Sequence, residues 1–543
     1  MLSQKQTEIY ERAVSAMGMM LNAGGASSGM IKLYGPNGKP LAPSSGGYTY
    51  QRSGAKRAGS MKNWRPRKIG GQVQEAMERE ALTARAIDLV QNDPNAAGAV
   101  DGIAQAVIGA GLTPQPLIDH DAFYSIDKEE AKTIQRQQRN IYKTWAPFAD
   151  AGGRLNNGAI QFLLLCNTLE YGEYLVLLPM LDDPTRPYSL AVQVLNPLRL
   201  KTPLDLVGKR NIRDGVELGE YGEAKAYWIK KSDALNPDKY TADVSRNFLS
   251  IPRKQGHRLN VLHGFVCKEP EQVRGVTFFA PAMKLFRDLN DYLDAELVSN
   301  IVTAAFSLFI ETGAADDPSI YAKMLANSTL DYTDADGNAK QERYQEMIPG
   351  QVMYGAAGQK PHPIAANRPG ATFEPFTRLI KKTLSMALGV PYPVLFRDPE
   401  NVNFAGFRSA MLDAWRVFMN YRSFIGQGYC QPVFTMLMEE AWLKNQIDHI
   451  DDFYENMWAL TRADWRGAPK GDIEPVKAAQ ADVLLIKNKL KSRGEAITER
   501  GGDRSAVFEE LAEENEDLLS KNLDPSCDES AVNIEKEQTD EAD

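Results

Sequence analysis

The residues of this chain that could do chemistry are few and widely spaced. Five histidines occur in 543 residues, and none stands in an H-E-x-x-H arrangement. The closest pair, His257 and His263, lies in a segment with the pattern of a loop or strand, so we expect structural or surface histidines rather than zinc ligands. The four cysteines are too far apart for zinc-ligand pairs and too few for a disulfide framework, which favours a reducing compartment.

One acidic cluster could bind a divalent ion. Asp448, His449, Asp451 and Asp452 stand close together near the end of an expected helix, and carboxylates of this kind serve as ligands in nuclease sites. Adjacent acids at a helix end more often form a solvated surface, and no second carboxylate motif completes a two-metal site. A soluble metal-dependent hydrolase using Asp448, Asp451 and Asp452 remains the alternative interpretation.

Other signatures of catalysis do not occur. The chain contains no G-x-S-x-G elbow and no set of kinase motifs. Gly109-Ala110-Gly111 fails as a dinucleotide fingerprint, because Pro114 replaces the third glycine and the preceding pattern is helical. We therefore expect no enzyme, no catalytic residue, no metal and no cofactor.

The composition predicts a folded, multi-domain chain with polarised ends. Hydrophobic residues make up 43% and charged residues 24%, and the length exceeds what one core can accommodate. The net charge is −9, but residues 1–70 hold eleven Lys/Arg against two acids, whereas residues 501–543 hold fifteen acids against three Lys/Arg. No apolar run reaches the roughly 18 residues of a membrane span, and the N-terminus lacks the apolar core of a secretory signal.

The middle of the chain has an α+β pattern. Helical periodicity runs from about 74 to 91, and Asn92-Asp93-Pro94 ends this helix and begins the next. Strand-like runs at 173–178, 190–195 and 224–229 are separated by Pro, Gly and Asp turns. We expect a basic irregular arm over 1–70, followed by an α+β body over 71–280.

A long helix is expected over 281–311. One face is apolar, and past Leu297 almost every position is apolar, so this half should be buried on all sides in a core or a subunit contact. The apolar face consists of Leu285, Leu289, Tyr292, Leu293 and Leu297. The opposite face is charged and consists of Lys284, Arg287, Asp288, Asp291 and Asp294.

The second half continues with an insert, a second helix and a loop. Residues 312–370 are rich in Gly, Pro and Asp, with short strand candidates. A helix follows within 371–390, on which Phe376, Leu379, Ile380 and Leu384 oppose Arg378, Lys381 and Lys382. The loop 391–404 leads to helices over 405–445, interrupted by glycines and a proline, then to a helical region over 446–523 and an acidic tail over 524–543.

The order of several short motifs resembles the lambda family of tailed-phage portal proteins, over about residues 80–520. Each motif is weak by itself, and their collinear order is what makes the likeness specific. The motifs are Val90 to Pro94, Val107 to Pro116, Tyr171-Gly172-Glu173, Leu195-Asn196-Pro197, Gly215-Val216-Glu217, Gln272 to Val276, Leu388 to Tyr392, Asn403-Phe404 with Arg408, and Glu474 to Ala479.

The resemblance implies a portal-type subunit that assembles into a ring, usually of twelve copies, at one capsid vertex. The α/β wing would be 71–280, the two-helix stem 281–311 and 371–390, the mixed clip insert 312–370, the channel loop 391–404, the wing helices 405–445 and the crown 446–523. Double-stranded DNA would pass through during packaging and ejection, and the implied partners are the major capsid protein, scaffold, terminase large subunit and head-tail adaptor. The chain would belong to the virion and to the host cytoplasm during assembly; another phage head structural protein is a further alternative.

The resemblance also places candidate contacts with DNA. The channel-loop candidates are Arg397, Asp398, Glu400, Asn401 and Asn403, and backbone contacts could come from Arg378, Lys381 and Lys382, although a solvated helix face is the simpler interpretation. Each cation that neutralises a phosphate adds sequence-independent affinity, and many would stall a sliding polymer. Twelve copies at −9 each repel DNA, which favours passage over grip. Deleting 397–402 should keep the ring and lower DNA retention in filled heads.

Overall fold

The computed structural model describes most of the chain after residue 70. The described residues are 71–119, 126–209, 211–231, 243–305, 373–400, 402–447, 450, 453–471, 474–502 and 504–521, with short strands at 33–34, 40–41, 308–311, 329–333, 339–343 and 352–355. The chain divides into two units, Met1–Ile69 and Gly70–Asp543. In the first, β1 (Leu33–Tyr34) pairs antiparallel with β2 (Pro40–Leu41); the rest of the expected basic arm lies outside the described residues.

Two helices open the second unit where the sequence predicts them. Helix α2 spans Gly71–Asn92 and α3 spans Pro94–Val107. Asp93 separates them, because its carboxylate caps α3 by accepting from the backbone N–H groups of Asn95 (2.7 Å) and Ala96 (3.2 Å). Its other oxygen accepts from Asn290 of the long helix α6 at 2.9 Å. One buried side chain therefore connects three helices.

Helices α4 and α5 cover the main core. Helix α4 (Lys128–Trp145) begins with a capping box between Asp127 and Glu130, and α5 spans Asn157–Glu170. Trp145 at the end of α4 is fully buried, and its indole N–H donates to the carbonyl of Leu190 at 2.8 Å. This core also contains apolar side chains of α3, α10 and α11.

Two small antiparallel sheets form the β part of the unit. The first has the order β12-β4-β5 and the second the order β6-β7-β8-β9, and a separate apolar cluster including Leu175, Tyr227 and Val261 packs beside them. The expected strand at 190–195 is shorter, because Leu190 forms only an isolated bridge with Met180. The bounds are β4 Glu173–Leu177, β5 Gln193–Leu195, β6 Ile212–Arg213, β7 Val216–Leu218, β8 Ala224–Lys230, β9 Phe248–Pro252 and β12 Val261–Phe265.

Two further strand pairs and four short 3-10 helices complete this part. β3 pairs antiparallel with β17, which lies far along the chain, and β10 forms a hairpin with β11. The bounds are β3 Thr113–Pro116, β17 Ala463–Arg466, β10 Lys254–Gln255, β11 Arg258–Leu259, η4 Ala146–Phe148, η5 Pro197–Arg199, η6 Leu204–Leu206 and η7 Ser245–Asn247.

The long helix is shorter than the sequence predicts. Helix α6 spans Met283–Ala305, and Leu308–Glu311 forms strand β13 in parallel with β16 (Val352–Gly355), because its apolar run makes ladder hydrogen bonds instead of another helical turn. β14 (Thr329–Thr333) and β15 (Ala339–Arg343) form an antiparallel hairpin within the insert. The second expected helix is α8 (Phe373–Leu388).

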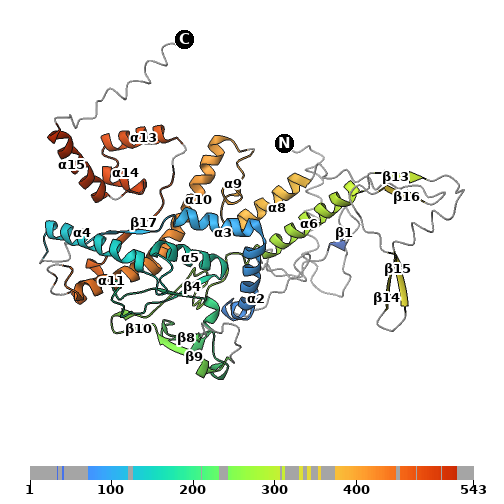
Figure 1. Cartoon of the computed structure of the whole chain (residues 1–543), viewed down its shortest axis with the longest axis horizontal. Helices are drawn as coiled ribbons and strands as arrows, with labels where there is room; N and C mark the ends of the chain where they lie inside the picture. The colour runs from blue at the N-terminus through green and yellow to red at the C-terminus, as the bar shows by residue number, and fades with distance from the viewer. Residues whose placement is uncertain are drawn as a thin grey trace, which may run out of the picture. The chain divides into compact units, whose positions relative to one another are not determined.

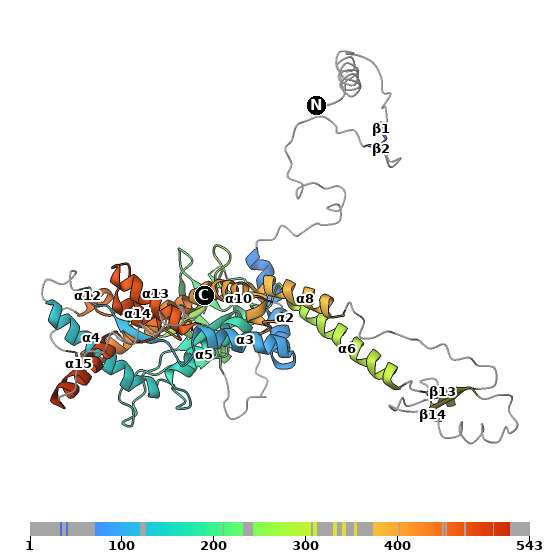
Figure 2. The ribbon, with the colours of Figure 1, turned by 90° about the horizontal axis from the view of Figure 1, so that it is seen from above.

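Helices α6 and α8 run side by side in both ribbon views (Figures 1 and 2). Aromatic rings join them, since Tyr292 stacks on Phe373 at 5.7 Å between ring centroids and meets Phe376 edge-on at 5.2 Å. The start of α6 and the end of α8 pack in the main core through Phe286, Leu289 and Leu384, which are fully buried.

The expected interruption at 426–432 is a π-helical turn and not a break. Helix α10 (Phe404–Ile425) continues through η8 (Gly426–Cys430) into α11 (Gln431–Leu443). Pro432 fits because it lies in the first turn of α11, where its missing N–H is not needed. Gly428 leaves room for Tyr174, since a Cβ there would lie 2.6 Å from the phenol oxygen.

Strand β17 (Ala463–Arg466) interrupts the region at 446–523 that the sequence predicts to be helical, and the other elements of its described part are helices. These helices are α12 (Phe453–Leu460), α13 (Pro475–Lys487), α14 (Arg493–Glu499) and α15 (Arg504–Ser520). The acidic tail beyond Lys521 lies outside the described residues. Among the helices that the structure describes, none combines the length and apolar character needed to cross a membrane.

Candidate functional site

The charged face of α6 is exposed and largely neutralised by its own pairs. Lys284 contacts Asp288 at 2.7 Å and Arg287 contacts Asp291 at 3.1 Å, both one helical turn apart. Asp294 is also exposed. Such exposed ion pairs contribute little to the stability of the fold. Because each cation is paired with an acid, the face carries charges of both signs and little net charge.

The described part of the apolar end of α6 is exposed in the single chain, so of the two expected surroundings, a core or a subunit contact, the core of its own chain does not cover it. Leu297 is 60%, Val298 59% and Ile301 48% exposed. On α8, Phe376 is 46% and Leu379 60% exposed, whereas Leu384 is buried. The sequence could not distinguish burial within the chain from burial by a second copy, because both require the same run of apolar residues.

The candidate DNA contacts on α8 differ in their surroundings. Arg378 is paired with Glu374 at 2.7 Å, and the Lys381 ammonium lies 5.6 Å from the ring centroid of Phe396. Of the three, Lys382 is the only one that is exposed.

The predicted channel loop folds on itself and on α3. It contains the short helix α9 (Tyr392–Leu395), and the Tyr392 hydroxyl donates to Asp398. The hydrogen bond from Tyr392 lowers the pKa of Asp398, with a smaller contribution from Arg378, and burial together with Asp398 raises the pKa of Tyr392 to about 12. Asn403 caps α10 by accepting from the Gly406 N–H at 2.8 Å.

The remaining loop candidates have separate positions. Arg397 has a left-handed backbone (φ 52°), and its guanidinium lies over α3, 3.3 Å from where a Cβ on Gly102 would stand. Glu400 is exposed and donates its N–H to Asp398 at 3.1 Å, and Asn401 lies outside the described residues. Within this loop, Asp398 and Asn403 thus hold local structure, whereas Glu400 faces outward.

The metal-site alternative cannot be placed. Asp448, His449, Asp451 and Asp452 lie outside the described residues. Among the residues that are described, no three His, Cys, Asp or Glu side chains gather as metal ligands would. His257 stacks against Tyr454 at 5.0 Å between ring centroids, and His263 contacts Glu173, so this pair does not converge on one point.

The most constrained polar site is a buried ion pair that sequence reasoning missed. Glu173 at the start of β4 is 1% exposed and Arg274 is 4% exposed. The Arg274 Nε lies 2.9 and 2.8 Å from the two Glu173 carboxylate oxygens, and Nη2 makes a further contact with the same carboxylate. His263 of β12 contacts it at 2.9 Å and the Gly275 N–H donates to it at 3.0 Å.

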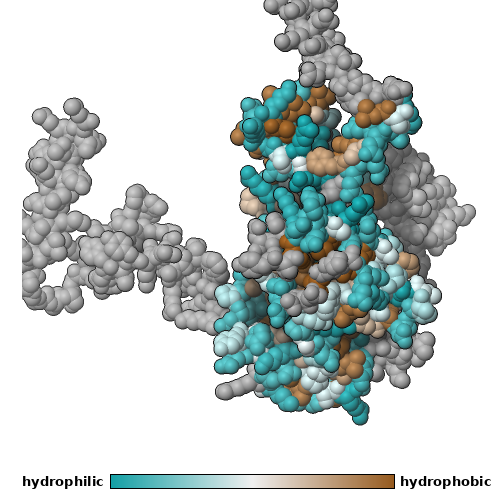
Figure 3. All heavy atoms as spheres, turned by 90° about the vertical axis from the view of Figure 1, so that its left-hand side faces the viewer, coloured by the Kyte–Doolittle hydropathy of each residue, from teal (hydrophilic) through white to brown (hydrophobic). Residues whose placement is uncertain are grey.

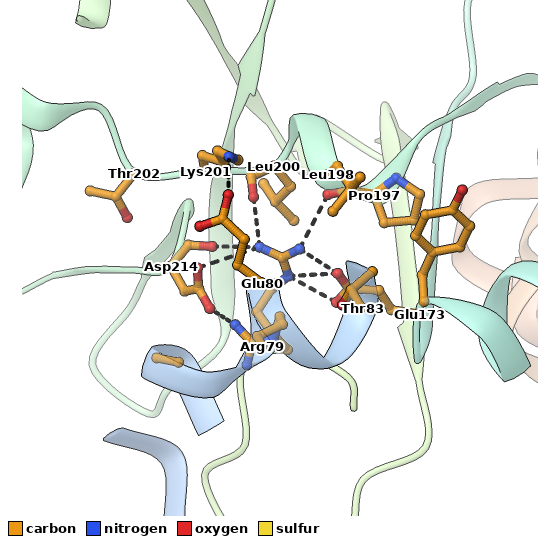
Figure 4. A pocket seen from close by; sticks show the side chains of 13 residues that line it. Arg79, Glu80, Thr83, Glu173, Pro197, Leu198, Leu200, Lys201, Thr202 and Asp214 are labelled. Carbon is orange, nitrogen blue, oxygen red and sulfur yellow. Dashed lines mark hydrogen bonds and ion pairs between the residues drawn. The ribbon is translucent and has the colours of Figure 1, made fainter. Parts of the chain in front are cut away.

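The remaining N–H groups of Arg274 join backbone segments that are distant in sequence. Nη1 donates to the carbonyls of Leu200 (2.7 Å) and Asp214 (2.9 Å), and Nη2 donates to Pro197 (3.2 Å). In Figure 4, Glu173, Pro197, Leu200 and Asp214 lie around the dashed lines that mark these contacts. An arginine has five N–H donors in a fixed fork, and here all five are used. We call Glu173, His263, Arg274, Gly275 and these three carbonyls the Arg274 hub.

Helix α2 attaches to the Arg274 hub from outside. Arg79 pairs with the Asp214 carboxylate, and its Nε donates to the Gly275 carbonyl at 3.2 Å. Asp214 (φ 50°) and Gly215 (φ 85°) form the two-residue turn between β6 and β7, the Asp-Gly hairpin turn that requires positive φ at both positions. An adjoining recess of about 250 Å³ is lined by Arg79, Glu80, Thr83, Lys201 and Asp214 among others (Figure 4).

The electrostatics show that the hub is structural. Burial raises the pKa of Glu173, but the positive charge of Arg274 and the hydrogen bonds from His263 and Arg274 outweigh burial and hold that pKa far below its usual value. A carboxylate whose pKa is lowered in this way is a weak base, and the guanidinium has all its donors bonded within the chain, so we interpret the hub as a structural element. The sequence offered only weak signals of this buried ion pair. Glu173 is a charged residue at the start of an apolar strand, and Arg274 is a charged residue before a glycine.

The hub brings together several motifs that the sequence contains far apart. Glu173 of Tyr171-Gly172-Glu173, Pro197 of Asn196-Pro197, and Asp214, which precedes Gly215-Val216, all contact the guanidinium of Arg274. Gly172 (φ 89°) and Gly275 meet at their backbones, since a Cβ on Gly275 would lie 2.0 Å from the Gly172 carbonyl oxygen. These motifs therefore share one role, which is to join the two sheets to α2.

Comparisons with known proteins agree with the motif order. Residues 57–422 match the profile of the family described as phage portal protein, lambda family. The chain is 23% identical over 518 residues to the portal protein of Escherichia phage N15 and 24% identical over 530 residues to portal protein B of Escherichia phage lambda, covering 91% of this chain and 94% of each relative. A chain from the neck of a native GTA particle aligns with a TM-score of 0.40 at 12% identity, covering 78% of this chain and 99% of that one.

Proposed function

Because this chain belongs to the lambda family of phage portal proteins, we propose that its copies close into a ring, of twelve by the family's usual number, at one vertex of the capsid. Double-stranded DNA passes through this ring during packaging and ejection. The capsid protein and scaffold surround it, and the terminase large subunit and the head-tail adaptor dock on it in turn. The chain contributes a passage and a platform, and performs no reaction of its own.

The observation that carries the ring is the exposed apolar end of α6 beside α8. Leu297, Val298, Ile301 and Leu379 each expose about half of their surface or more in the single chain. Covering the exposed half of one such side chain stabilises a contact by about 1 kcal/mol. Two neighbouring helices with this composition are a subunit contact, and in a closed ring every copy uses it on both sides.

The charge distribution suits passage of DNA. Twelve copies at −9 each repel a polyanion. The cations Arg287 and Arg378 are already paired with Asp291 and Glu374. Few cations therefore remain to bind DNA phosphates. Because each such contact would add affinity through counterion release, their scarcity lets the DNA slide through the ring.

Replacing Leu297 and Ile301 by aspartate should abolish rings. The change removes apolar area and would place carboxylates in the subunit contact, where their desolvation is unfavourable. Electron-microscopic class averages and the mass from light scattering of the purified full chain measure the outcome. Asp294→Ser on the charged face is the matched control and should leave rings intact; rings as abundant in the double aspartate variant as in the parent would refute this role of α6.

The loop 391–404 gives a second test, on DNA retention. The structure favours point substitutions over deletion of 397–402, because deletion would also remove Asp398, the partner of Tyr392. Arg397→Asn should leave rings unchanged and lower the fraction of filled heads that retain DNA, because the loop loses a cation that can neutralise a phosphate. Retention is measured by nuclease protection, with Arg416→Gln on exposed α10 surface as the control. Unchanged retention would count against the loop.

A further inference from the structure

The C-terminal helices α13, α14 and α15 lack a core of their own. Of residues 475–521, all but 503 and 505 have a described burial, and none of these is buried. Their apolar side chains face outward: Val476, Val483, Leu484, Leu490, Phe508, Leu511 and Leu519 are between 39% and 75% exposed. In Figure 3, brown side chains gather at the upper end of the visible face, where these helices lie. A helical module of this kind needs a covering partner.

Hydrogen bonds and ion pairs hold α13 and α14 together even though these helices have no apolar core of their own. Asp482 of α13 accepts from Lys491 at 2.8 Å and from Arg500 at 3.0 Å, which connects the start and the end of α14 to α13. Ser492 and Glu495 form a capping box at the start of α14. Helices α13 and α14 are therefore held in a defined arrangement, and α15 follows α14 directly along the chain.

The α13–α14 face and the α15 face carry opposite charge. Residues 475–500 contain six Lys/Arg and three Asp/Glu, including Lys487, Lys489 and Arg493 near the apolar residues of α13. Residues 504–520 contain six Asp/Glu and one Arg, and Glu510, Glu513 and Glu514 flank the apolar residues of α15. Contact between two copies of α15, or between two copies of α13, brings like charges together, which is unfavourable.

We propose that the partner is a second copy of this chain, with the α13–α14 face of one copy packed on the α15 face of the next. The contact is head-to-tail, because the two faces differ in charge, and a head-to-tail contact that repeats with a constant rotation closes into a ring. This inference rests on the proposed function and adds to it a second contact between neighbours, separate from the α6–α8 contact.

Cysteine cross-linking between two kinds of copy tests the contact. Full chains carrying Leu484→Cys and differently tagged full chains carrying Leu511→Cys are co-expressed in a Cys267→Ser, Cys527→Ser background, and the rings are then oxidised. We expect a disulfide-linked dimer that contains both tags, and only traces of dimers with one tag. Leu204→Cys, on an exposed site of the wing, replaces Leu484→Cys in the matched control and should give no cross-link to Leu511→Cys.

Reversal of charges on the two faces is a second, independent test of the contact. Lys487→Glu with Lys489→Glu and Arg493→Glu should lower the yield of the mixed-tag dimer roughly tenfold, the effect of three lost exposed pairs. Adding Glu510→Lys, Glu513→Lys and Glu514→Lys on the same chain should restore it.

The outcomes separate the two proposals. Rings in the electron microscope without the mixed-tag dimer would overturn the α13–α15 contact and leave the ring standing, and so would a predominance of single-tag dimers. Absence of rings in the unsubstituted chain would overturn both proposals.

Discussion

Arg274→Met is expected to lower the free energy of unfolding by about 3–5 kcal/mol, the usual effect of leaving one member of a buried ion pair without its partner. The substitution leaves the Glu173 carboxylate buried with only His263 and the Gly275 N–H as partners. It also removes the donors to the carbonyls of Leu200 and Asp214. Urea unfolding of the full chain, followed by circular dichroism, measures the loss.

The control variants separate charge from packing. Arg416→Met removes an arginine whose side chain is 82% exposed and should change the unfolding free energy little. Glu173→Leu added to Arg274→Met removes the uncompensated charge and should recover part of the loss, because an apolar pair can replace a buried ion pair. A double variant at least as unstable as the single one would contradict the view that the unpaired carboxylate dominates.

The pH dependence of the unfolding free energy gives a second test of the Glu173–Arg274 ion pair. The folded-state pKa of Glu173 is held far below its usual value, so its ionised form stabilises the fold at neutral pH. This stabilisation begins to fade as the pH falls below the unfolded carboxyl value of about 4 and is lost towards the folded pKa. In Arg274→Met the largest cause of the depression is absent, so the unfolding free energy should fall less steeply with acidification than in the parent.

Local signals in the sequence predicted local structure well. Asp93 before Pro94 located the junction of α2 and α3, because an N-cap carboxylate and an N1 proline act within four residues. Helices α8 and α10 were likewise expected from periodicity close to their observed bounds. Such features depend on neighbours along the chain, which the sequence displays directly.

Long-range contacts were outside the reach of the same reasoning. Glu173 and Arg274 are 101 residues apart, and nothing at either position indicates the other. Whether Leu297 and Ile301 are covered by their own chain or by a second copy was left open for a different reason, since periodicity records that a face is apolar but not which chain covers it. The sequence indicated a loop at 391–404 but not its fold, which depends on the hydroxyl of Tyr392 and on space over Gly102 of α3.

Gly172→Ala is expected to destabilise the chain by about 4 kcal/mol, near the upper end for a single substitution, because it forces packed backbone apart in a core. Gly172 has φ 89°, and its Cβ would stand 2.3 Å from the carbonyl carbon of Val276, which is backbone and cannot rotate away. The segment from Gly275 to Thr277 would have to move, and with it the N–H of Gly275 that binds Glu173. Urea unfolding of the variant and its parent measures the effect.

Gly208→Ala is the control that separates the two effects expected at Gly172, the clash of the added Cβ with Val276 and the strain of a positive φ. Gly208 has nearly the same φ, 92°, but nothing lies within 4 Å of its added Cβ. It should therefore show the conformational cost alone, about 1–2 kcal/mol. Because the two glycines differ in surroundings and not in φ, the difference between the variants measures how tightly the Tyr171-Gly172-Glu173 and Arg274-Gly275 segments are packed. Equal losses at the two positions would mean that Gly172 is needed only for its φ, and that the segment at 275–277 yields to a methyl group.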